Sequence, residues 1–241
     1  MDRHYKDQLP QQVAVLIDQI EAYARREIQI AVDTRPVSPT DPNPDRLAAE
    51  VTEQRATIYL RAPDAFPPHG VLHELLHIHR FWVDGIPQVL PVHDPDGERL
   101  QVTGSIENAL EHQIIVPREA EYGFEPYSYW NETERRLWGQ YPWPAITNQW
   151  ARRKNSLLGW LTVSRLVSDD QVKAQAADCL KKEGLFDEAQ RFATRIAGVI
   201  ESKPRSISAT LRFLKIPIQD VRLVRFNVLT EQRDFIPIPE H

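Results

Sequence analysis

The chain has 241 residues, of which 41% are hydrophobic, and a formal net charge of −5. That length can bury a core as one large domain or as a domain with an appendage. We expect neither a membrane span nor a secretion signal, because there is no apolar run of about 18 residues and no basic start before an apolar stretch. The single Cys179 excludes an internal disulfide framework and favours a reducing, cytoplasmic location. The acidic balance argues against nucleic acid as a partner, since phosphate binding needs clustered Lys and Arg.

The N-terminal part of the chain predicts one helix and two strands. Apolar side chains recur at helical spacing from Gln11 to Arg26, whereas Glu27 to Thr34 alternates like a strand. Ala56 to Leu60 is rich in strand-forming residues and predicts a second strand. At a sheet edge, Thr57 to Arg61 could pair with an extended peptide substrate; an internal strand is the alternative.

The residues His73-Glu74-Leu75-Leu76-His77 form an HExxH motif, the most informative pattern in the chain. On a helix, histidines at positions i and i+4 project from one face and can bind a single Zn²⁺. Glu74 then lies beside the metal, where a carboxylate can activate a water molecule. The motif predicts His73 and His77 as metal ligands and Glu74 as the catalytic base of a metallohydrolase.

Helix-breaking residues limit the motif helix on both sides. Pro67 and Pro68 precede it, and Gly85 with Pro87 follows it. Apolar residues cover most of its circumference, so we expect a buried helix whose histidines open onto a cleft. Buried imidazoles need partners, and a metal ion would supply them.

A second helix is expected to complete the site, because hydrolytic zinc takes three protein ligands and keeps one open position. Helical spacing from Ser105 to Pro117, where we expect the helix to end, places Glu107 and Glu111 at i and i+4. We favour Glu107, 30 positions after His77, as the ligand. Glu111 would then accept the second ring N–H of a ligand histidine, and the reverse order stays open. His112 is a further candidate, as a ligand or as the group that stabilises an oxyanion.

The segments on either side of this second helix carry weaker signals. Val89 to Val92 and Arg99 to Val102 predict a hairpin, with Asp94 to Gly97 as its turn. An aromatic-rich segment follows the helix. Further candidates for stabilising the oxyanion are Arg118, Tyr122 and Tyr127.

These residues resemble the gluzincin-type zinc peptidases, and most nearly the ImmA/IrrE family of bacterial regulatory metallopeptidases. The likeness covers about residues 50 to 120: a strand, HELLH, a connection of about 30 residues, and an acidic helix ending in Ile114-Ile115-Val116-Pro117. Glu107, Asn108 and Ala109 stand in the place of the family's Glu, Ala, Asn cluster, in a different order. The resemblance implies a compact zincin-like fold that cleaves one or a few protein partners, often repressors.

From Trp150 onward the pattern changes to helices without obvious catalytic residues. Asp169 or Asp170 can cap a helix that ends near Gly184. Asp220 to Val228 predicts a final strand before a Pro-rich end.

The sequence therefore predicts an α+β, zincin-like metallopeptidase fold, with a small sheet and the HExxH helix in a catalytic domain over residues 1–150. Residues 151–241 would form a mostly helical C-terminal appendage. The expected function is zinc-dependent hydrolysis of a peptide bond in a specific protein or peptide partner, with Zn²⁺ as cofactor. The alternative is a non-catalytic interaction module on a metal-bound or degenerate zincin scaffold. The intact Glu74 argues against it, because a purely structural zinc site needs no base. Nothing in the sequence indicates the oligomeric state.

Overall fold

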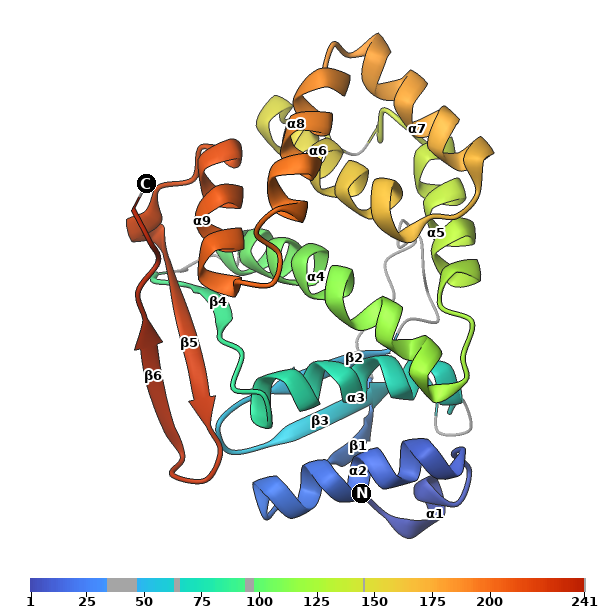
Figure 1. The fold of residues 1–241 in the computed structure, drawn as a ribbon, viewed down its shortest axis with the longest axis vertical. Helices are drawn as coiled ribbons and strands as arrows, with labels where there is room; N and C mark the ends of the chain where they lie inside the picture. Colours follow the sequence, from blue (N-terminus) through green and yellow to red (C-terminus); the bar gives the residue numbers. More distant parts are fainter. Residues whose placement is uncertain (34–46, 63–65, 94–97, 145, 241) are drawn as a thin grey trace. The chain divides into compact units, whose positions relative to one another are not determined.

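The computed structural model describes residues 1–33, 47–62, 66–93, 98–144 and 146–240. Within these ranges the chain is of the α+β class, with many helices and two sheets of three strands each (Figure 1). None of the described helices is long and apolar enough to cross a membrane.

Two compact units make up the chain, and each is discontinuous in sequence. The first unit comprises residues 1–88, 118–124 and 224–235, and the second comprises residues 89–117, 125–223 and 236–241.

The first unit contains a small sheet covered by helices. Its strands lie in the order β1 (Gln29–Val32), β3 (Ala56–Leu60), β2 (Ala48–Val51). β3 pairs in parallel with β1 and antiparallel with β2. Helix α3 (Pro68–Trp82) packs against β2, β3 and helix α2 (Gln11–Ala24), and the short α1 (Arg3–Lys6) precedes α2 (Figure 1).

Several expectations for this unit are confirmed. The predicted first helix, the strand expected from Glu27 to Thr34 and the motif helix are α2, β1 and α3. The interpretation of β3 as an exposed edge is wrong, because β3 is the central strand and both of its sides are paired. Four of the five residues of β3 are buried, so its side chains do not alternate between buried and exposed positions as those of an edge strand often do.

The second unit is mainly helical. Asp169 caps α7 by accepting from the backbone N–H groups of Gln171 and Val172, as predicted. The elements are β4 (Gln88–Pro91), α4 (Glu98–Glu119), α5 (Tyr127–Gly139), α6 (Gln149–Leu166), α7 (Asp170–Lys182), α8 (Phe186–Ala197) and α9 (Lys203–Leu214), with a 3-10 turn at Ile218–Asp220. The last two residues of α4 and the 3-10 turn at Ala120–Tyr122 belong to the first unit.

The second sheet has the order β4–β5–β6, with β5 at Val221–Asn227 and β6 at Gln232–Ile236. The predicted strand at Asp220 to Val228 is confirmed. β6 was not expected, because its exposed side chains do not alternate clearly between polar and apolar.

Helix α4 corrects two expectations. Arg99 to Val102 belongs to this helix and is not a strand, so the predicted hairpin is wrong; its turn, residues 94–97, lies outside the described residues. The hydroxyls of Thr103 and Ser105 donate to the carbonyls of Arg99 and Gln101, one helical turn earlier, as Ser and Thr do inside a helix. Pro117 lies inside α4 and does not end it.

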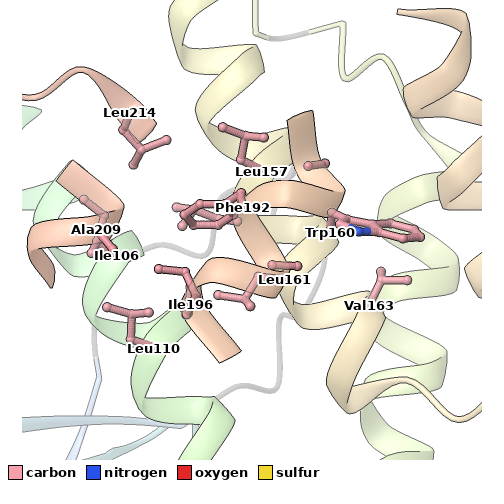
Figure 2. Close-up of a cluster of buried hydrophobic side chains, with 14 of the residues drawn as sticks. Ile106, Leu110, Leu157, Trp160, Leu161, Val163, Phe192, Ile196, Ala209 and Leu214 are labelled. Atoms are coloured by element: carbon pink, nitrogen blue, oxygen red, sulfur yellow. The ribbon is translucent and has the colours of Figure 1, made fainter. Parts of the chain in front are cut away.

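One face of α4 packs into a buried apolar cluster. Ile106 and Leu110 of α4 contact side chains from α6, α8 and α9 (Figure 2). Glu111 is 1% exposed and the side chain of Glu107 is 12% exposed, so neither carboxylate lies on a solvated face. Other members labelled in Figure 2 are Leu157, Trp160, Leu161, Val163, Phe192, Ile196, Ala209 and Leu214.

Candidate metal centre

Helix α3 carries a stripe of histidines along one side. His69, His73 and His77 follow one another at i, i+4 spacing, which places them on one face. The rings of His73 and His77 lie edge to face, with centroids 5.1 Å apart. His77 and Glu74 are buried, with 8% and 6% of their surface exposed. The HExxH residues therefore lie on a largely buried helix, as the sequence predicted, and His73 is half-buried. The cleft expected beside the histidines stays a prediction.

Glu119, at the end of α4, binds two of these histidines. Its Oε1 accepts a hydrogen bond from Nδ1 of His73, and its Oε2 accepts one from Nε2 of His69, both at 2.7 Å. The carboxylate is only 2% exposed. A proton on Nδ1 leaves the lone pair of His73 on Nε2, which is the form of imidazole that binds a metal ion.

The electrostatics of Glu119 agree with this geometry. Burial works to raise the pKa of this carboxyl, but the hydrogen bonds from His69 and His73 outweigh it and hold the pKa below its usual range. Glu119 is therefore ionised at neutral pH. It provides a fixed negative charge behind His73.

His69 connects this carboxylate to the surface. Its side chain is 33% exposed and stacks on the ring of Phe124, with centroids 4.9 Å apart and an interplanar angle of 18°. The stacking fixes the ring plane, so that Nε2 points at Glu119. Sequence reasoning missed both Glu119 and His69. The i, i+4 spacing of His69 with His73 was the available signal for the histidine, whereas Glu119 lies beyond the expected helix end at Pro117.

His112 supplies a third imidazole. It is buried in α4 and its ring lies against that of Trp130, with centroids 4.8 Å apart. His112 belongs to the second unit, whereas His73 and His77 belong to the first.

Glu107 and Glu111 have a different partner from the one expected. The ammonium group of Lys203, at the start of α9, lies 2.5 Å from Oε1 of Glu107 and 2.6 Å from Oε1 of Glu111. The other oxygen of Glu107 accepts the backbone N–H of Val89 at 2.8 Å. Both oxygens of Glu107 therefore have donors from the protein, which disfavours this residue as a metal ligand.

The buried Lys203 holds this acidic pair together. Burial raises the pKa of Glu107, an effect that the charge of Lys203 only partly opposes and that the neighbouring Glu111 reinforces. Burial would lower the pKa of Lys203, but the two carboxylates raise it. The lysine therefore stays charged, and the pair has a structural explanation without a metal ion.

The other candidates for oxyanion stabilisation make local contacts. Arg118 forms an ion pair with Asp84 at 3.8 Å. Burial raises the pKa of the Tyr122 phenol, so this group remains a hydrogen-bond donor at neutral pH. Tyr127 begins α5 and donates its backbone N–H to Glu125. A catalytic role for any of them stays a prediction.

Comparison with known proteins adds no relative. No family model, no curated protein and no solved structure matches the chain. The likeness to gluzincins therefore rests on the motif residues.

Proposed function

We propose that the chain is a zinc-dependent metallopeptidase with a zincin-like catalytic core, in which His73, His77 and His112 hold the metal ion and Glu74 is the general base. The observation that carries this proposal is the hydrogen bond of 2.7 Å between His73 Nδ1 and Glu119 Oε1. Metal-binding histidines usually donate their second ring N–H to a carboxylate or carbonyl, which orients the ring. An HExxH helix without a metal needs no such buried carboxylate.

The donor set is suited to zinc. Three neutral imidazoles leave a fourth position for water or substrate, as hydrolytic zinc requires. A histidine as the third metal ligand differs from the gluzincin resemblance, which implies a glutamate at that position. We choose His112 because it is a buried imidazole on the acidic helix, whereas Glu107 and Glu111 bind Lys203.

The proposed reaction is direct hydrolysis of a peptide bond in a protein or peptide substrate. Zinc, when bound, polarises the scissile carbonyl and lowers the pKa of water towards about 7. Glu74 accepts a proton from the attacking water and delivers it to the leaving amine nitrogen. Glu119 holds the ring of His73 in place while these transfers occur. The burial of Glu74 keeps competing solvent away from the base.

The ligand assignment is tested by metal content. The protein and its variants are purified without added metal and zinc is measured by mass spectrometry. We expect His73→Ala, His77→Ala and His112→Ala to lose zinc, because each removes one of three ligands. Glu107→Gln and Glu111→Gln should keep it. Loss of zinc from Glu107→Gln with retention by His112→Ala would instead restore the ligand set expected from the sequence.

The base is tested by Glu74→Gln. The amide keeps the shape of the side chain but cannot accept a proton, so cleavage should fall by roughly 10²- to 10⁴-fold while zinc content stays unchanged. Cleavage is measured by mass spectrometry on a peptide library, with and without a zinc chelator. Equal cleavage by Glu74→Gln and wild type would overturn the mechanism. A zinc-loaded wild type that cleaves no peptide in the library would favour the non-catalytic interaction module.

A further inference from the structure

Helices α8 and α9 border a hollow that the proposed peptidase chemistry does not use. Its volume is about 190 Å³, and it is lined by Arg195, Ala209, Arg212 and Phe213. Both arginines are exposed, whereas Ala209 is buried and Phe213 is half-buried. The hollow therefore combines an apolar floor with two cationic groups at its rim.

Positive charge gathers on this part of the chain. Residues 186–216 contain six Lys or Arg against three Asp or Glu, in a protein whose net charge is −5. Lys203 is buried with its two acidic partners. The five other basic residues are all exposed: Arg191, Arg195, Arg205, Arg212 and Lys215.

Glu188 on α8 is a half-buried acid that lies among several of these basic side chains. Glu188 pairs with Arg153, and its pKa is held below the usual range by the hydrogen bond from Arg153 and by the charges of Arg191 and Lys215. One carboxylate therefore faces three cationic groups. Residues 186–216 therefore carry more basic than acidic side chains, and an anionic ligand is the complement that they fit.

The floor of the hollow is held rigidly by the helices behind it. Phe213 packs edge to face on Phe192 of the core, with ring centroids 5.4 Å apart. Its carbonyl accepts a hydrogen bond of 2.6 Å from Arg153, and the next carbonyl, that of Leu214, accepts one of 3.0 Å from Trp150. Both donors come from α6 and satisfy the last carbonyls of α9. A preformed hollow loses little entropy when a ligand is bound.

We propose that this surface docks an acidic peptide segment that carries an apolar side chain between its carboxylates. The volume of the hollow is below the roughly 300–1,000 Å³ of cofactor and drug-sized sites, so it accommodates one side chain and not a whole small molecule. An apolar side chain would cover Phe213 and Ala209, while flanking Asp or Glu residues would pair with Arg195 and Arg212. This proposal does not depend on the metal centre.

The experiment measures fluorescence anisotropy of a labelled peptide, Gly-Glu-Asp-Phe-Glu-Asp-Gly, with the full chain; the integrity of the probe is checked by mass spectrometry. We expect Arg195→Glu and Arg212→Glu each to weaken binding by about tenfold or more, because each replaces attraction by repulsion. The matched control is Arg165→Glu, an exposed arginine near the end of α6, which should stay within about twofold of wild type. Circular dichroism confirms that each variant is folded.

Three further probes test separately the carboxylates of the peptide, its apolar side chain and the class of ligand. A peptide with Gln and Asn in place of Glu and Asp should lose binding, and a peptide with Gly in place of Phe should bind about tenfold more weakly. A 12-nucleotide single-stranded DNA should bind more weakly than the acidic peptide. If the DNA binds more tightly and with the same dependence on Arg195 and Arg212, the surface docks nucleic acid and the proposal is overturned. It is also overturned if Arg165→Glu weakens binding as much as the two test variants, or if the acidic peptide does not bind below about 1 mM.

Discussion

Glu119 holds the rings of His69 and His73 in fixed orientations by hydrogen bonds. It accepts from His73 and His69 at the same time and is almost fully buried. Its loss should release the ring of His73 without removing a ligand atom. The effect on zinc binding should therefore be smaller than that of losing His73 itself.

We predict that Glu119→Ala weakens zinc binding by about 10- to 100-fold, the usual cost of removing a carboxylate behind a ligand histidine. Glu119→Gln should lose less, because its amide oxygen can still accept from His73. Competition with a chromogenic chelator measures the affinity. The control is Glu121→Gln, an exposed acid two residues away. Unchanged affinity in Glu119→Ala would mean that Glu119 does not orient a metal ligand.

A second buried acid, Glu134, gives a prediction on stability. Burial raises its pKa to about 8, although the hydrogen bond from Trp138 Nε1 at 2.9 Å opposes the shift. The folded state keeps this proton to a higher pH than the unfolded state. Its contribution to stability is therefore fully present below the unfolded pKa, near 4.5, and is lost as the pH rises towards 8.

Glu134→Gln should remove this pH dependence, because the amide has no charge to bury and its oxygen can still accept from Trp138. The variant and wild type should have similar free energies of unfolding at pH 5. At pH 8 the variant should be more stable, by on the order of a few kcal/mol. Urea unfolding at both pH values measures the difference. Parallel pH profiles for the two proteins would contradict the prediction.

At the scale of elements, the buried cluster of Lys203, Glu107 and Glu111 ties α9 to α4, and Glu107 ties α4 to the start of β4. Replacing the lysine alone leaves two carboxylates buried without their cation. We predict that Lys203→Met lowers the free energy of unfolding by about 3–5 kcal/mol, measured in urea.

The triple variant Lys203→Met, Glu107→Gln, Glu111→Gln is the matched control. It should recover most of this loss, since no charge is then left unpaired, and it should bind zinc like wild type. A stable triple variant that has lost zinc would show that the acidic pair belongs to the metal centre after all.

At the scale of the whole molecule, the metal ion should add to the stability of the folded chain. Binding to the folded state alone contributes about 2.7 kcal/mol at a free zinc concentration 100 times the Kd. In a chain of this length, that corresponds to a rise of roughly 5–10 °C in Tm. Differential scanning calorimetry with zinc and with excess chelator measures the shift. His73→Ala should show no such shift, and an identical Tm for wild type with and without zinc would contradict the metal centre.

Local signals in the sequence were enough to predict α2, α3, β1, β3 and the strand at β5. Each depends on the spacing of apolar residues and on nearby helix-ending residues, which act over one or two turns. The juxtaposition of His73 and His77 is equally local, because i, i+4 spacing on any helix places two side chains on one face. For the same reason the sequence could not choose among Glu107, Glu111 and His112 as the third ligand. Its distance along the chain says nothing about its distance in space.

Tertiary structure decided the role of the acidic residues. The sequence offered Glu107 and Glu111 as ligands, but Lys203, more than 90 positions later, binds both. The continuation of α4 past Pro117 brought Glu119 to the histidines instead. A carboxylate looks the same in sequence whether its partner is an ammonium group, an imidazole or a metal ion. Only the packing of distant segments determines which partner it meets, because a buried charge must be neutralised by whatever group the fold places beside it.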